Sequence, residues 1–103
     1  MKLSVCAVRD SKANAYAPPI FTRTRAVAER WFYEQAGNPD HDFFKSSRDY
    51  ALFHLGEFDD ETAVFTPLPQ PVPILDAFFC KNMILAEAGV DPLANARQLQ
   101  TAQ

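Results

Sequence analysis

The sequence predicts an α+β fold: a small antiparallel sheet (a hairpin plus an N-terminal strand) packed against one main amphipathic helix, with short C-terminal helices. Three observations favour this class. Residues 3–8 alternate with the period of two that is typical of a strand. Residues 25–36 contain no Gly or Pro and carry an apolar stripe. Residues 50–58 and 63–66 form a hairpin around the turn-forming run 59–62, and such elements bury their apolar sides by packing in two layers.

The N-terminal strand over residues 3–8 is fairly apolar on both of its faces, which places it inside the sheet rather than at an edge. Residues 10–19 follow as a connecting arm without a period and end in two prolines. We expect Ile20 and Phe21 to form a brief extended piece that tucks under the sheet.

The main helix over residues 25–36 begins after Thr22 or Thr24, because a threonine hydroxyl accepts a hydrogen bond from a free N–H of the first turn. Four apolar side chains share its expected buried stripe: Val27, Ala28, Trp31 and Phe32. Gly37 is expected to end the helix in the left-handed conformation, and Pro39 blocks its continuation.

The hairpin follows a polar, turn-rich segment over residues 38–49. Gly56, inside its first strand, indicates a bulge or a close approach of two backbones. Prolines then alternate with other residues over 67–73. Because each proline removes a backbone donor, this stretch fits an extended sheet edge or a linker and not a central strand.

The C-terminal part of the chain is predicted to be helical. Residues 74–88 permit a helix that ends at Gly89, and a capping Asp followed by Pro precedes a last short helix over 93–100. The apolar face of the first of these helices is made of Ile74, Leu75, Phe78 and Phe79. We therefore divide the chain into a single α+β core domain over residues 1–76 and a C-terminal helical extension over 77–103.

Length and composition exclude several classes of protein. The chain has 103 residues, which fits one domain. It has no run of about 20 apolar residues and no secretory signal pattern, so we expect a cytosolic protein with no membrane partner. Cys6 and Cys80 are too few for a disulfide scaffold and lack metal-ligand spacing, so both are expected to be small buried hydrophobes.

Catalytic and metal-binding motifs are not recognisable in the sequence, which has no Gly-rich phosphate loop, no C-x-x-C and no H-E-x-x-H. The neighbouring residues 40–42 (Asp-His-Asp) cannot all point at one ion from a regular element, and His54 fits a cross-strand hydrogen bond better than a metal ligand. Four acidic residues surround the hairpin turn: Glu57, Asp59, Asp60 and Glu61. Carboxylates of this kind bind Mg²⁺ or act as acids and bases, but a turn favours Asp for conformational reasons alone. We expect no catalytic residue, no metal and no cofactor.

The distribution of charge suggests a nucleic-acid surface. Residues 1–30 carry six basic and two acidic side chains, whereas residues 31–103 carry four basic and eleven acidic ones. Basic side chains neutralise phosphates and aromatic faces stack on bases, so their mixture in the N-terminal third suits single-stranded nucleic acid. The candidate nucleic-acid-binding residues are Arg9, Lys12, Tyr16, Phe21, Arg23, Arg25 and Arg30. An uneven scatter of solvated charges is the alternative interpretation.

Four runs of sequence carry a resemblance to a known family: MKLSV at residues 1–5, RDSKA at 9–13, PIF at 19–21 and, above all, DYALFHLGEFDDET at 49–62. Together they resemble the small non-structural protein of gokushovirus-type microviruses, which are icosahedral phages with single-stranded circular DNA. The resemblance spans about residues 1–76.

The resemblance implies a protein of the infected cell, acting in the host cytoplasm in the switch from duplex replication to the synthesis and packaging of single-stranded genomes. It implies no role in the mature shell and carries over no catalytic residue. The expected partners are single-stranded or duplex viral DNA and phage replication or procapsid proteins, and a homo-oligomer is left open.

Three hypotheses of function follow. The first is a DNA-binding accessory protein without catalysis. The second is a protein-interaction adaptor that links the replication machinery to the assembling procapsid, favoured by the acidic remainder of the chain, the alternating prolines and the apolar run over residues 74–79. The third, the least favoured, is a metal-dependent enzyme that uses the acidic hairpin.

Overall fold

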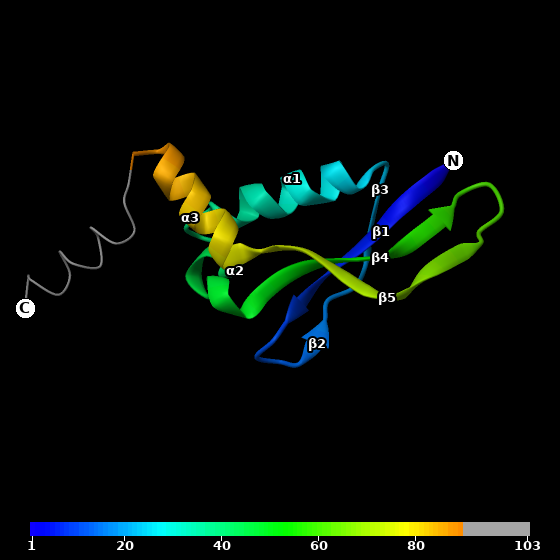
Figure 1. Cartoon of the computed structure of the whole chain (residues 1–103), viewed down its shortest axis with the longest axis horizontal. Coiled ribbons are helices and arrows are strands. Elements are labelled where there is room, and N and C mark those ends of the chain that lie inside the picture. The colour runs from blue at the N-terminus through cyan, green and yellow to red at the C-terminus, as the bar shows by residue number, and fades with distance from the viewer. Residues whose placement is uncertain (90–103) are drawn as a thin grey trace, which may run out of the picture.

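A computed structural model describes residues 1–89 of the chain and confirms the α+β class (Figure 1). The strands form one antiparallel five-stranded sheet: β1 (Lys2–Asp10), β2 (Ala15–Tyr16), β3 (Ile20–Thr22), β4 (Tyr50–Asp59) and β5 (Phe65–Asp76). The helical elements are α1 (Arg25–Ala36), α2 (Asp42–Lys45), the 3-10 helix η1 (Ser47–Asp49) and α3 (Ala77–Glu87). The short helix expected over residues 93–100 lies outside the described residues.

β1 lies inside the sheet, as the sequence predicts. β4 pairs with it along its whole length, and both β3 and β2 pair with its other edge, β3 opposite Ser4–Cys6 and β2 opposite Arg9–Asp10. The segment expected to be a connecting arm without a period therefore contains a short strand, β2. The chain reverses because Asn14 takes a left-handed φ of 54° and because the Asp10 carboxylate accepts hydrogen bonds from the next turn residues.

The proline-rich stretch belongs to β5, which is the edge strand of the sheet. This confirms the edge interpretation. A proline has no backbone N–H to donate, and an edge strand tolerates this because it pairs with a neighbour on one side only. The strand starts at Phe65 and not at residue 63, because Ala63 takes a left-handed φ of 63° and still belongs to the turn. Figure 1 shows the β4–β5 hairpin projecting beyond the helices at one end of the molecule.

Gly56 marks a bulge in β4, as predicted. The pairing of β1 with β4 shifts between Val5 and Cys6, and the pairing of β4 with β5 shifts between His54 and Gly56. A Cβ atom at position 56 would lie 2.4 Å from the backbone oxygen of Thr66. Only glycine lets β5 approach β4 this closely.

Helix α1 has the predicted bounds, and two of the four residues of its predicted stripe, Ala28 and Phe32, are buried. Its buried side chains are Ala28, Phe32 and Ala36, which are spaced four residues apart, whereas Val27 is 51% exposed and Trp31 is half-buried. The buried stripe is therefore rotated around the helix relative to the predicted one. Ala28, Phe32 and Ala36 belong to one core cluster with Cys6, Val8 and Leu52 of the sheet, and packing on these strands determines which side of α1 is buried. Thr24 is the N-cap, but its hydroxyl makes no capping hydrogen bond.

Gly37 ends α1 in a right-handed conformation, with φ −93°, so the expected left-handed ending is wrong. The position instead lies close to α3: an added Cβ would lie 2.6 Å from Cδ1 of Ile84, so the Ile84 side chain would have to move. The left-handed ending occurs at Gly89, with φ 79°, where the sequence also predicts a helix end.

Helix α3 starts later than predicted. Its N-cap is Asp76, whose carboxylate accepts a hydrogen bond from the N–H of Phe79 at 2.7 Å, so Ile74 and Leu75 belong to β5. Ala77 and Cys80 are fully buried against α1 and the sheet, whereas Phe79 is 54% exposed.

Both cysteines are free and buried, as expected. Burial raises the pKa of the Cys80 thiol to about 11 and also raises the pKa of the Cys6 thiol. Within residues 1–89, no helix has the length and the hydropathy that a membrane crossing requires.

A candidate nucleic-acid interface

The sheet has one face that the described helices do not cover. Cys6 and Val8 of β1 point toward the helices and belong to the core. Because side chains alternate along a strand, Val5, Ala7 and Arg9 point to the opposite side, which we call the open face. Leu3 shares this face by the same alternation. Each of these four residues of β1 pairs with an aromatic residue of a neighbouring strand: Arg9 with Tyr16, Val5 with Phe21, Ala7 with Phe53 and Leu3 with Phe58.

The four rings form two edge-to-face pairs across β1. The ring centroids of Tyr16 and Phe53 are 5.5 Å apart at 80°, and those of Phe21 and Phe58 are 5.3 Å apart at 79°. The pairs explain why Val5 and Ala7 are each only 1% exposed although no described helix covers them. The small side chain of Ala7 leaves room for rings from both flanking strands to meet above β1.

The rings remain accessible although they bury the strand beneath them. Tyr16 is 43% exposed and Phe21 is 50% exposed. Phe65, opposite Phe58 in β5, is 45% exposed and extends the aromatic surface toward the hairpin. Rings that are fixed by a neighbour and open to solvent provide a stacking surface for bases that have left a duplex.

Arg9 supplies a cation at one end of this aromatic surface. Its guanidinium lies 5.9 Å from the centroid of the Tyr16 ring and donates a hydrogen bond to the side chain of Asn14. Lys12 is exposed in the turn between β1 and β2, at the same end of the sheet. Phosphates of a strand stacked on the rings would meet positive charge here.

The other predicted basic residues lie on or near α1, which packs on the opposite face. Arg25 pairs with Glu29 at 3.6 Å and Arg30 pairs with Glu34 at 3.3 Å, so each has a carboxylate one turn along the helix. Arg23 is exposed in the segment just before α1. The structure thus places Arg9, Tyr16 and Phe21 on the open face and Lys12 in the turn at one end of it. Arg23, Arg25 and Arg30 lie on or just before α1, away from that face.

Phe53 and Phe58 complete the surface, and sequence reasoning missed both. They are five residues apart, so simple alternation along β4 would place them on opposite faces. The bulge at residues 55–56 restores them to one face, because it shifts the pairing of β4 with β1 by one residue. The signal that reveals this is Gly56, the residue that indicates the bulge.

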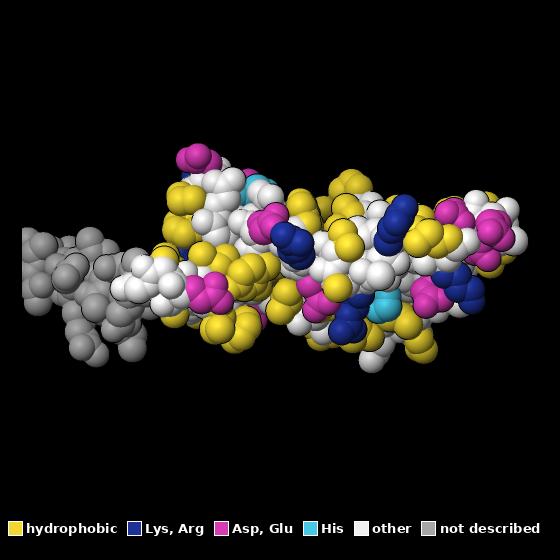
Figure 2. All heavy atoms as spheres, turned by 90° about the horizontal axis from the view of Figure 1, so that it is seen from above, with side chains coloured by type: hydrophobic (Ala, Val, Ile, Leu, Met, Phe, Trp, Pro, Cys, Tyr) yellow, Lys and Arg dark blue, Asp and Glu magenta, His cyan; other side chains and the backbone are white. Residues whose placement is uncertain are grey.

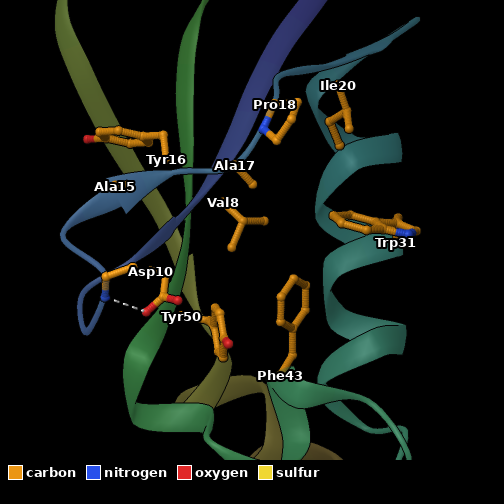
Figure 3. A pocket seen from close by; sticks show the side chains of 11 residues that line it. Val8, Asp10, Ala15, Tyr16, Ala17, Pro18, Ile20, Trp31, Phe43 and Tyr50 are labelled. Atoms are coloured by element: carbon orange, nitrogen blue, oxygen red, sulfur yellow. Dashed lines mark hydrogen bonds between the residues drawn. The ribbon is translucent and has the colours of Figure 1, made fainter.

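The covered side of the sheet carries a different kind of hollow. An apolar cavity of about 320 Å³ lies between the β1–β2 hairpin and α1, as Figure 3 shows. Trp31 and Phe43 meet edge to face at 5.9 Å on its helical side, while the ring of Tyr16 points away from it. The carboxylate of Asp10 is held by the turn through Ala13 N–H, so the cavity offers few free polar groups. Its lining would accommodate an apolar group.

The acidic hairpin tip has a conformational role. The Asp59 carboxylate accepts a hydrogen bond from the N–H of Glu61 at 2.9 Å, and this bond is the main reason why the pKa of Asp59 is lowered. The amino group of Met1 lies 2.8 Å from the Asp60 carboxylate. Figure 2 shows a group of acidic side chains at this end of the molecule, with others spread along it, whereas the basic ones in that view stand apart from one another.

The histidines serve local structure. Nε2 of His54 lies 3.1 Å from the carbonyl oxygen of Gly56 in the same strand, so the expected cross-strand hydrogen bond is wrong. Nδ1 of His41 accepts a hydrogen bond from the N–H of Phe43 and caps α2. Across residues 1–89, no three His, Cys, Asp or Glu side chains come together as metal ligands would.

Comparison with known proteins yields one match. A family model described as Phage ORF5 protein matches residues 3–80, which run from the second residue of β1 to the first turn of α3. No curated protein and no solved structure shows a significant similarity to the chain.

Proposed function

The chain belongs to the Phage ORF5 protein family, and on that premise we propose that it is a non-structural accessory protein of a gokushovirus-type microvirus that binds viral DNA without catalysis. In this proposal it acts in the host cytoplasm, in viral DNA replication and in the synthesis and packaging of single-stranded genomes. The observation that supports it is the open face, where Tyr16 and Phe21 are exposed and Arg9 lies beside Tyr16.

The chemistry of this face favours single-stranded over duplex DNA. A duplex hides the faces of its bases inside the stack, whereas a single strand offers them to Tyr16, Phe21 and their partner rings. Contacts through stacking and phosphate neutralisation read no particular sequence. Such binding suits a protein that must coat or guide a genome strand of any sequence.

The charge of the hairpin orients the strand in this proposal. Glu61, Asp60 and Asp59 gather at the tip of the β4–β5 hairpin and repel phosphates, whereas Arg9 and Lys12 lie at the far end of the sheet. The DNA strand therefore lies toward the β1–β2 turn and does not reach the tip.

Titration of a labelled oligo-dT strand, followed by fluorescence anisotropy at low ionic strength, tests the proposal. Tyr16→Ala and Phe21→Ala are each expected to weaken binding by roughly tenfold, since one stacked base is worth about 1–3 kcal/mol. Phe79→Ala is the matched control, because Phe79 is similarly exposed but lies on α3. A wild-type protein that shows no salt-sensitive binding to single-stranded DNA contradicts the proposal.

The adaptor remains a second candidate, and the apolar cavity beside Trp31 is the observation that favours it. In this alternative a phage replication or procapsid protein inserts an apolar side chain there. Ala15→Leu at the cavity wall is then expected to abolish capture of that protein while oligo-dT binding is unchanged. Equal capture by wild type and variant contradicts the adaptor. Whether the chain forms a homo-oligomer is a separate prediction, and analytical sedimentation of the purified protein measures it.

A further inference from the structure

Three basic side chains from three separate elements meet in one hollow on the helical side of the molecule. Lys45 ends α2, Arg48 lies in η1 and Lys81 lies in α3, and all three line a hollow of about 400 Å³. Ser46 and Ser47 line it as well. Sequence reasoning counted these cations only as part of an acidic remainder, although they are three of its four basic residues.

Aromatic rings hold two of the cations in place. The guanidinium carbon of Arg48 lies 4.0 Å from the centroid of the Phe78 ring, and Nζ of Lys81 lies 4.0 Å from that of Phe44. Nζ of Lys81 also donates a hydrogen bond to the carbonyl oxygen of Phe44 at 3.0 Å. These contacts fix where the charges stand without neutralising them.

The charges of this hollow differ from those on α1. Among the ion pairs within residues 1–89, Arg25 and Arg30 each have a glutamate partner, but Lys45, Arg48 and Lys81 have no carboxylate within 4.0 Å. Asp49 is the one acidic residue among the described lining residues, which leaves an excess of positive charge. Like charges brought together in a hollow repel one another unless an anion joins them.

We propose that Lys45, Arg48 and Lys81 form a phosphate-binding site. A phosphate group matches it because Arg and Lys supply several charged donors to one oxyanion and the serine hydroxyls supply neutral ones. If the phosphate belongs to DNA, which rests on the proposed function, the site binds the backbone of the strand away from the open face. The alternative source of the same chemistry is a free phosphate or a nucleotide.

Two measurements on the full chain test the site. The first is an anisotropy titration of oligo-dT with Lys45→Gln, Lys81→Gln and the control Lys2→Gln, which removes the same charge near the acidic hairpin. We expect each of the first two variants to weaken binding about threefold to fivefold and to reduce the salt slope by about 0.7, the value for one lost phosphate contact on a single strand. The control is expected to change neither.

The second measurement is an NMR titration of the wild-type protein with inorganic pyrophosphate. We expect shifts confined to the residues of the hollow, above all Lys45, Arg48 and Lys81. Because it uses no variant, this result does not depend on whether a substitution disturbs folding.

The outcomes separate this inference from the proposed function. Shifts in the hollow together with weaker oligo-dT binding by both variants assign the site to DNA. Shifts in the hollow without any binding of oligo-dT support a site for free phosphate and contradict the proposed function. If pyrophosphate causes no shifts in the hollow, or if Lys2→Gln weakens oligo-dT binding as much as the other two variants do, the phosphate site is overturned. The proposed function still stands in that case, provided that oligo-dT binding depends on Tyr16.

Discussion

The two faces of the sheet bury their central residues by different means. On the covered face, helices bury Cys6, Val8 and Leu52 to between 0 and 7% exposure. On the open face, Val5 and Ala7 reach 1% exposure beneath two pairs of aromatic rings, which themselves stay partly open to solvent. Where rings replace helices, the same side chains both stabilise the fold and remain available to a ligand.

This difference separates two classes of substitution. A change in the covered core should alter the free energy of unfolding without altering what the folded molecule binds. A change in the ring pairs should alter both quantities at once.

Phe32→Ala is expected to have the largest effect on stability. Phe32 is fully buried in the covered core and contacts Phe43, with ring centroids 5.1 Å apart. The cavity left by the substitution should lower the free energy of unfolding by about 3–5 kcal/mol. Urea denaturation followed by circular dichroism measures it, and a loss below about 1 kcal/mol would place Phe32 outside the core.

Gly56→Ala is expected to come next, because its Cβ would meet the backbone of Thr66 at 2.4 Å. Overpacking of this kind costs about 1–3 kcal/mol. Gly37→Ala is the matched control: its Cβ would meet side-chain atoms of Ile84 and no backbone atom, and a side chain can move more easily than a paired strand. The same denaturation experiment should show a clearly smaller loss for Gly37→Ala, and equal losses would contradict the close approach of β5 to β4.

Phe58→Ala should lower stability less, by about 1–2 kcal/mol, because the side chain is only partly buried and pairs with the half-exposed Phe21. Unlike Phe32→Ala, it should also weaken oligo-dT binding by the folded protein. Denaturation and anisotropy on the same preparation measure the two effects. If stability falls while affinity is unchanged, the ring pairs serve the fold alone.

The last prediction concerns the rate at which the buried thiol of Cys80 reacts, and involves no change in stability. Burial raises the pKa of Cys80 to about 11, so at pH 8 only about one thiol in a thousand is the reactive thiolate. Reaction with a disulfide reagent should be at least about 100-fold slower in the native protein than in urea, and should accelerate as the pH rises toward 11. Rapid labelling of the native protein at pH 8 would contradict the burial of Cys80.

Local signals in the sequence determine much of this fold. The bounds of α1 follow from the absence of Gly and Pro over residues 25–36 and from Gly37 and Pro39 beyond them. The edge position of β5 follows from its prolines, and the bulge follows from Gly56. Each of these depends on the chemistry of the residue itself, which requires no knowledge of distant neighbours.

The remaining features depend on contacts between distant segments. The buried stripe of α1 is rotated by its packing on β1 and β4, and the space at Gly37 is limited by Ile84 of α3. Arg9, Tyr16 and Phe21 were predicted as candidates from composition, but their partners Phe53 and Phe58 come to the same face only through the bulge. The basic hollow forms because α3 returns to η1, which no local pattern indicates.

The central claim is that the open face of the sheet binds single-stranded DNA, and an NMR titration with oligo-dT tests it most directly. We expect the largest shifts on the rings of Tyr16, Phe21, Phe53 and Phe58 and on Arg9, while Ala28 and Phe32 of α1 stay unchanged. Shifts confined to the cavity beside Trp31, or no shifts at all, would contradict it.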